Sequence, residues 1–250
     1  MDFPLSGTGI FGGTLVGSIG WGISAAITFI ISLWLFKRCK NEQSKTFKYF
    51  ALFIGARFLL FFFIALAPVI YLLTNNLVLA GTSITMLYTF MFVSFLFPPL
   101  LFTSFKWPGL KKYYFGFILL LVIAGVGMAI ASFEPAFYVP EAQAVLQKTP
   151  NLMLNGLYPM AKILSVLPLA ILFLGYAITS PGIRLKARAF LMGMGLLWVI
   201  TTIIVPTLIP PLWAGMYCSV GDILIFLGLM IRPKQQKISA KKFTSQMIRP

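Results

Sequence analysis

The chain has 250 residues, of which 59% are hydrophobic and only 10% charged, with a mean hydropathy of +0.94 and a formal net charge of +15. This apolar fraction exceeds what a soluble domain of this length needs to build a core, which excludes the soluble globular class. The charge does not indicate a nucleic-acid partner, because 17 of the 20 lysines and arginines lie in four short segments that alternate with nearly uncharged ones. That alternation is the positive-inside pattern of a polytopic membrane protein.

Seven apolar runs are long enough to cross a bilayer. They are continuous rather than alternating, and backbone polar groups cannot be left unpaired in lipid, so the sequence predicts an all-α bundle rather than a barrel. We expect one seven-helix transmembrane domain over residues 1–231 and a basic tail over 232–250. The expected spans are about 11–36, 49–74, 77–105, 113–132, 157–180, 189–209 and 211–231.

The basic segments place the N-terminus outside and the tail in the cytoplasm, in a plasma or inner membrane. Six basic residues in the tail also make it a candidate for binding anionic lipids. Asn75 and Asn76 predict a tight outer turn. In the longest outer connection, 133–156, a proline followed by apolar residues at helical spacing predicts a short surface helix over 140–148.

Asp222 lies near the middle of the last span and is one of five acidic residues in the chain. An ionisable group at mid-membrane is costly, so it marks a partner or a site. Asp222 lies nine residues from Ile231, at the inner end of its span, and Arg57 lies nine residues from Lys48, at the inner end of the second span. At 1.5 Å per residue both sit about 13 Å above the inner surface. Equal depth predicts an Arg57–Asp222 ion pair, in which the arginine fork holds the carboxylate by two hydrogen bonds.

Lys162 is the rival partner, but its expected place about five residues from the outer end would let it snorkel to the headgroups. A third alternative is a neutral, protonated Asp222, because burial disfavours the charged carboxylate. The residues nearest in depth that are expected to line a cavity around the pair are Thr85, Thr89, Trp198, Tyr217 and Ser219. The pair itself is either a fixed strut or a switch that a ligand or a proton breaks.

The chain contains no histidine, which excludes imidazole acid–base chemistry and histidine-ligated metal sites. No two carboxylates are spaced to share a metal or a substrate proton, and no phosphate-binding loop or nucleophile motif is present. We therefore expect no enzyme activity, no metal and no cofactor. Gly9, Gly13 and Gly17 recur every four residues from just before the first span into it, and they favour close helix packing inside the bundle over a dimer interface.

In size, seven spans and outside N-terminus, the chain resembles microbial rhodopsins. Their seventh helix carries a retinal-linking lysine at its middle, where this chain has CSVGD at 218–222, and the acidic counter-ion of their third helix is also missing. The resemblance is one of topology only, and it does not imply retinal. Many seven-helix sensor domains and small sugar transporters share this topology.

Three functions fit these observations. The first is a non-enzymatic receptor or sensor organised by Arg57 and Asp222, with an unknown small ligand or membrane protein as partner. The second is a small-solute or ion transporter, with Asp222 as the coupling carboxylate and Pro68, Pro168 and Pro206 as bending points. The third is a structural subunit of a membrane complex, with the glycine-rich first span as its interface.

Overall fold

The computed structural model describes residues 10–42, 44–105, 109, 111–150, 152–203 and 208–231. The protein is mostly helical, at 84%, which agrees with the predicted helical fold. The predicted tail over 232–250 and the predicted bending point at Pro206 lie outside the described residues.

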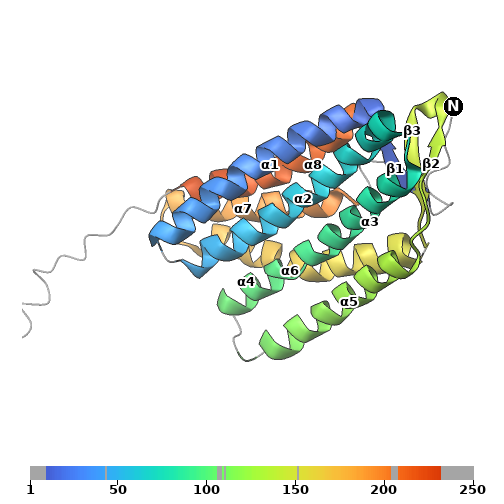
Figure 1. Ribbon diagram of the computed structural model, residues 1–250. Coiled ribbons are helices and arrows are strands. Elements are labelled where there is room, and N and C mark those ends of the chain that lie inside the picture. The colour runs from blue at the N-terminus through green and yellow to red at the C-terminus, as the bar shows by residue number, and fades with distance from the viewer. Residues whose placement is uncertain are drawn as a thin grey trace, which may run out of the picture.

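Most of the helices run along one common direction (Figure 1). A π-helical turn, Leu152–Leu157, leads directly into the helix that begins at Tyr158. The α-helices of the described residues are α1 (Leu15–Glu42), α2 (Lys45–Thr74), α3 (Leu77–Ser94), α4 (Phe97–Phe105), α5 (Lys111–Ala131), α6 (Tyr158–Thr179), α7 (Ile183–Thr201) and α8 (Pro211–Met230).

Six helical segments in the described part of the chain are long and apolar enough to cross a membrane. They are α1, α2, α3 together with α4, α5, α6 with the end of the π-helical turn, and α8. α7 is not among them; Arg184, Lys186 and Arg188 occupy its first two turns and leave 13 uncharged residues. The number of seven spans therefore stays a prediction.

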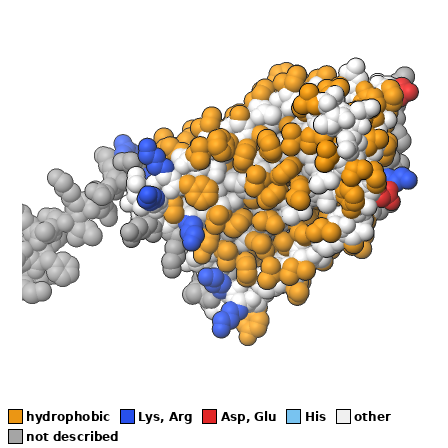
Figure 2. Space-filling view, in the orientation of Figure 1, with side chains coloured by type: hydrophobic (Ala, Val, Ile, Leu, Met, Phe, Trp, Pro, Cys, Tyr) orange, Lys and Arg blue, Asp and Glu red, His pale blue; other side chains and the backbone are white. Residues whose placement is uncertain are grey.

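The helices form a closed ring in which neighbours pack in the order α1, α2, α3, α5, α6, α7, α8 and back to α1. α4 lies against α2, α5 and α6. On the face shown in Figure 2, lysine and arginine side chains gather at one end of the ring, and acidic side chains lie at the other. We call the first the basic end; it contains the α1–α2 turn. The outside position of the N-terminus stays a prediction.

The α2–α3 turn has the tight form predicted at Asn75 and Asn76. Asn75 adopts the left-handed conformation, with φ 51°, which asparagine tolerates better than most residues. The side-chain oxygen of Asn76 then accepts hydrogen bonds from the backbone N–H groups of Val78 and Leu79. Asn76 is thus the N-cap of α3.

The third span breaks at Phe95 and Leu96 because Pro98 and Pro99 follow. Proline is accommodated in the first turn of the new helix, α4, but Pro99 has no N–H to donate to the carbonyl of Phe95. The Ser165 hydroxyl of α6 donates to that carbonyl instead, at 2.8 Å. Pro168 similarly leaves the carbonyl of Leu164 without its helical donor, and the hydroxyl of Tyr114 on α5 donates to it. Hydroxyls of neighbouring helices thus satisfy backbone groups that water cannot reach in lipid.

The predicted surface helix over 140–148 is wrong. A 3₁₀ turn, Pro140–Ala142, ends at Gln143 in the left-handed conformation and is followed by strand β3, Ala144–Lys148. β3 is the centre of an antiparallel sheet with the order β1-β3-β2, where β1 is Ile10–Thr14 and β2 is Phe137–Val139. In its register Ile10 pairs with Lys148, and Phe137 with Leu146.

Two physical reasons explain this difference. Residues 144 to 147 are all buried, and a short apolar run of this kind fits a covered strand as well as a helix. The second reason is that the partner strand β1, Ile10–Thr14, lies where the sequence predicts the start of the first span at residue 11. No strand was therefore expected there for β3 to pair with. The sheet lies at the end of the ring opposite the basic end (Figure 1), and we call this the sheet end.

Candidate functional site

Arg57 of α2 and Asp222 of α8 form the ion pair that their equal depth predicts. Nε of Arg57 donates to both carboxylate oxygens, at 2.7 and 2.9 Å. The expected two-armed fork is not used, because Nη2 donates at 3.0 Å to the backbone carbonyl of Cys218, one turn earlier on α8. Both side chains are buried, with Arg57 4% and Asp222 0% exposed.

The guanidinium of Arg57 also lies between two aromatic rings of its own helix. Its central carbon is 5.8 Å from the ring centre of Phe53 and 5.1 Å from that of Phe61. These residues are one turn before and one turn after Arg57, so the α-helix itself places them on the same face. Cation–π attraction of this kind stabilises a guanidinium that has left water.

Lys162 does not snorkel to the surface, and the prediction that it would is wrong. Its side chain is 1% exposed, and Nζ donates to the hydroxyls of Tyr158, at 2.8 Å, and Thr202, at 2.6 Å. The π-helical turn is the physical reason, because it extends the helical segment outward from Tyr158 to Leu152. Lys162 therefore lies ten residues from the start of that segment rather than five.

Lys162 joins the ion pair in one buried group. It is close enough to interact electrostatically with both Arg57 and Asp222. Thr202, which follows α7, also lies within hydrogen-bonding reach of the Cys218 thiol. We name the set Arg57, Lys162 and Asp222, with Tyr158, Thr202 and Cys218, the charge cluster. It contains two cations and one carboxylate, drawn from α2, α6 and α8.

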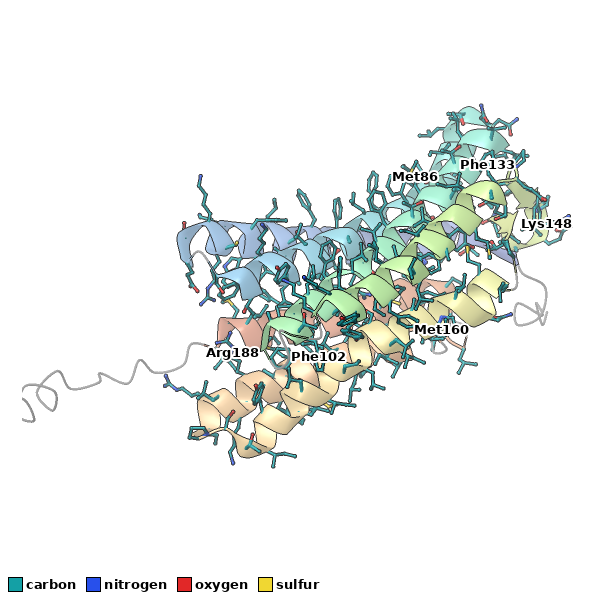
Figure 3. The ribbon with its side chains drawn as sticks, turned by 90° about the horizontal axis from the view of Figure 1, so that it is seen from below. Met86, Phe102, Phe133, Lys148, Met160 and Arg188 are labelled. Atoms are coloured by element: carbon teal, nitrogen blue, oxygen red, sulfur yellow. The ribbon has the colours of Figure 1, made fainter. Side chains whose placement is uncertain are left out.

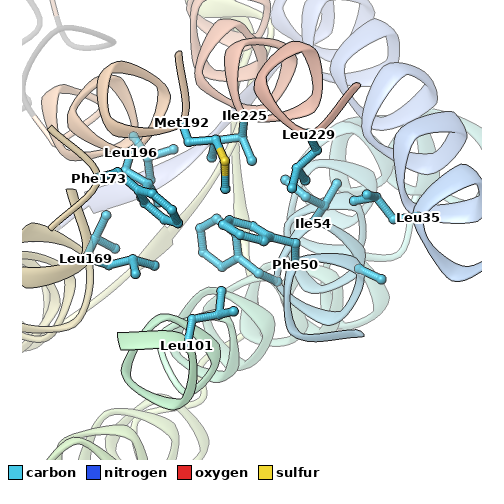
Figure 4. Packing of buried hydrophobic residues seen from close by; sticks show 14 of the residues in the cluster. Leu35, Phe50, Ile54, Leu101, Leu169, Phe173, Met192, Leu196, Ile225 and Leu229 are labelled. Atoms are coloured by element: carbon cyan, nitrogen blue, oxygen red, sulfur yellow. The ribbon is translucent and has the colours of Figure 1, made fainter. Parts of the chain in front are cut away.

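An apolar layer separates the charge cluster from the basic end. Ile54, Val166 and Ile225 lie one turn nearer to that end on α2, α6 and α8, and all three belong to one cluster of buried side chains. Figure 4 shows how it closes, with Phe50, Leu101, Leu169, Phe173 and Met192 directed toward one another between the helices. Two hollows on the surface of the described residues, one between α4 and α6 and one formed by α2, α6 and α7, are lined by none of the three charged residues of the charge cluster.

Three of the other predicted residues lie on α7 and α8, near the cluster. Nε1 of Trp198 donates to the backbone carbonyl of Tyr217 at 2.9 Å, and their ring centres are 4.7 Å apart. The hydroxyls of Tyr217 and Thr201 are 2.8 Å apart. Ser219 is buried and donates to the carbonyl of Met216 in its own helix. The contacts of Trp198 and Thr201 with Tyr217 hold α7 against α8 beside Cys218.

Thr85 and Thr89 lie elsewhere. Their hydroxyls donate to the carbonyls of Gly81 and Thr85 within α3, and Thr85 also accepts from the Gln147 side chain of β3. Within the described residues no hydrogen bond or ion pair joins either threonine to the charge cluster. Their predicted place around Asp222 rested on depth alone, and depth does not fix which helices face one another.

Three members of the charge cluster, Tyr158, Thr202 and Cys218, are not among the site residues predicted from the sequence. Tyr158 carries a detectable signal, since it lies four residues before Lys162 and such residues meet on one helix face. Thr202 and Cys218 carry none, because their role depends on how α7 and α8 meet. No group of three or more Cys, Asp or Glu side chains that could hold a metal occurs among the described residues. The absence of a catalytic role stays a prediction.

Comparisons with protein-family models, with curated proteins and with solved structures each give no match. Six apolar helices indicate a multi-pass membrane protein.

Proposed function

We propose that the protein is a non-enzymatic membrane receptor or sensor whose switch is the charge cluster. The observation that carries this proposal is that Lys162 is buried near the Arg57–Asp222 ion pair. Two basic side chains therefore interact electrostatically with a single carboxylate. A buried excess charge is costly unless it is compensated. A bound anion or the loss of a proton would relieve it and change how α2, α6, α7 and α8 pack.

The apolar layer favours a receptor over a transporter. Transport requires the binding site to open alternately to both sides, and the layer that contains Phe50 and Leu101 closes the basic end. A receptor needs only a change in helix packing that a partner protein reads.

A transporter is the second candidate, and two features of the helices favour it. The third span is broken at Phe95 and Leu96, and a π-helical turn precedes Lys162 on α6. π-helical turns are frequent at functional sites, and transporters build their sites from interrupted helices. The subunit alternative has less support, since Gly17 and Gly20 of α1 face Pro211 and Leu212 of α8 inside the same chain.

Hydrogen exchange of the protein in lipid nanodiscs tests the switch. Lys162→Met keeps the length of the side chain and removes its charge, so we expect altered protection of α6, α7 and their connection. Lys148→Met is the matched control, because Lys148 is exposed on β3. If Lys162→Met alters exchange no more than the control does, the cluster is a fixed strut and the proposal fails.

Ion flux into proteoliposomes separates the two candidates. The receptor proposal expects the wild-type protein to carry no proton current above that of protein-free vesicles under an imposed membrane potential. A current that Asp222→Asn abolishes would favour the transporter instead. The experiment should include Arg57→Gln, which breaks the ion pair but keeps the carboxylate of Asp222. This variant distinguishes a leak caused by loss of the pair from transport that depends on the carboxylate.

A further inference from the structure

Two hollows meet on the surface of α6 near the basic end. The first lies between α4 and α6, has a volume of about 520 Å³ and is lined almost entirely by apolar groups, among them Phe102, Ile171 and Leu172. That volume falls in the range of about 300–1,000 Å³ that is usual for small-molecule sites. Ile171 is 59% exposed and lies within a membrane-crossing segment, so the hollow opens toward the hydrocarbon.

The second hollow has a larger share of polar groups than the first and lies closer to the basic end. It is about 350 Å³ in volume and is formed by α2, α6 and α7, with Thr46, Ser180 and Arg188 contributing polar groups. Tyr176 lines both hollows. The first, apolar hollow, which we call the trough, therefore leads past the ring of Tyr176 to the hydroxyls and guanidinium of the second. In Figure 3, Phe102 of the first and Arg188 of the second lie toward the same end of the molecule.

Arg188 is available to an anion. It makes no hydrogen bond or ion pair with any residue in the described part of the chain, although it interacts electrostatically with Arg38 and Glu42. Those two are already paired with each other at 2.7 Å, so the carboxylate of Glu42 has a nearer partner. Basic side chains also gather at this end (Figure 2), which attracts anionic headgroups.

We propose that these two hollows form one binding site for an anionic phospholipid. An acyl chain lies in the trough between α4 and α6, and the phosphate is held by Arg188 with the hydroxyls of Thr46 and Ser180. Arginine suits a phosphate because its planar N–H groups match the oxygens. The site is separate from the charge cluster, so it stands or fails independently of the receptor proposal.

Native mass spectrometry of the full chain in detergent tests this site. The probes are dioleoylphosphatidylglycerol, dioleoylphosphatidylcholine with the same acyl chains, and inorganic phosphate. We expect one molecule of the anionic lipid to bind about fivefold more tightly than the zwitterionic one, which is the contribution of about one basic residue near a membrane surface. Phosphate alone should not bind, because it has no chain to fill the trough.

Two pairs of matched variants locate the site. Arg188→Gln should reduce the lipid preference about fivefold, to near one, whereas Arg184→Gln, an exposed arginine of the same helix, should retain it. Gly175→Phe should block the trough, since Gly175 lines it and has open space around its α-carbon. Gly127→Phe on α5 is the control, because Gly127 is equally open and lines neither hollow.

The proposal is overturned if both arginine variants lose the preference equally, which would indicate general charge attraction. It is also overturned if Gly175→Phe binds the lipid as well as Gly127→Phe does, or if phosphate competes as strongly as the lipid. Where Gly175→Phe does not fold, the arginine pair and the phosphate competition decide the result.

Discussion

Asp222 is paired with Arg57 and interacts electrostatically with Lys162, so removing the carboxylate and removing the lysine should affect stability by different amounts. Asp222→Asn leaves the buried guanidinium of Arg57 without its carboxylate, which should lower the free energy of unfolding by about 3–5 kcal/mol. Lys162→Met removes a cation together with its desolvation cost, at the loss of two hydrogen bonds. We expect the change to stay within about 1 kcal/mol. Thermal unfolding in detergent measures both.

Glu42→Gln is the control for this comparison. It removes the carboxylate of the Arg38–Glu42 pair, in which the glutamate side chain is 41% exposed, and surface pairs contribute about 1 kcal/mol or less. Should Asp222→Asn destabilise the protein no more than Glu42→Gln does, the cluster does not hold the fold in the way its geometry indicates.

For the residues of the charge cluster, the sequence predicted the contact that depends on depth in the membrane. It missed the contacts that depend on how each helix is rotated about its own axis. Arg57 and Asp222 could be matched by counting residues from the span ends. The place of Lys162 could not, because the π-helical turn ahead of it has no sequence signal that we can identify. The hydroxyl of Thr202 enters the cluster only through the packing of α6 on α7.

Among the helices, the carbonyl groups that prolines leave unpaired make a testable link between neighbouring elements. Tyr114→Phe on α5 should cost about 1 kcal/mol, because the carbonyl of Leu164 on α6 loses its donor. In a Pro168→Ala background the new N–H of residue 168 can bond that carbonyl within the helix. The same Tyr114→Phe change should then cost much less.

A double-mutant cycle of thermal unfolding midpoints measures this coupling. Tyr113→Phe serves as the control, since Tyr113 is 78% exposed on the same helix. Equal costs of Tyr114→Phe in the two backgrounds would mean that the hydroxyl does not act through the Leu164 carbonyl.

The close approach of α1 and α8 gives a second prediction for the elements. A β-carbon on Gly20 would overlap the backbone of Leu212, and one on Gly215 would overlap the backbone of Gly20. Gly20→Ala should therefore force the helices apart and lower stability by about 1–3 kcal/mol. Gly22→Ala, on the same helix with open space around it, should be neutral or should stabilise α1 by up to about 1 kcal/mol.

Helix unfolding curves for the two variants in the same detergent provide the measurement. A Gly20→Ala protein as stable as Gly22→Ala would contradict this packing.

Features that depend on nearby residues could be predicted from the sequence. The small residues of the first span predicted its close packing, and turn residues such as Asn75 predicted where a helix ends. The strand pairing of β1 with β3 was missed because it joins residues at least 130 positions apart.

As a whole, the molecule closes on itself in two ways. α8 packs against α1 and completes the ring, and β1 pairs with β3 across the sheet end. The N-terminal region therefore contacts both the last helix and the longest connection. The charge cluster lies inside this ring with an apolar layer on its basic side, so a change in its charge can affect the basic end only by moving helices.

Whether α7 crosses the membrane decides the topology of the whole chain. With 19 residues the helix is about 28 Å long, close to the hydrocarbon thickness of about 30 Å. Its three basic side chains all lie in the first two turns, from which arginine and lysine can snorkel to the basic side. We therefore expect α7 to span the bilayer, which places Lys186 on the cytoplasmic side and Leu208, in the α7–α8 connection, outside.

Cysteines introduced one at a time at 186, 208 and 148 test this with a membrane-impermeant maleimide on intact cells. The background is Cys39→Ser, in which the one remaining native cysteine, Cys218, is buried. Lys148→Cys and Leu208→Cys should be labelled at once, and Lys186→Cys only after permeabilisation. If positions 186 and 208 are labelled from the same side, α7 does not cross and the chain has six spans.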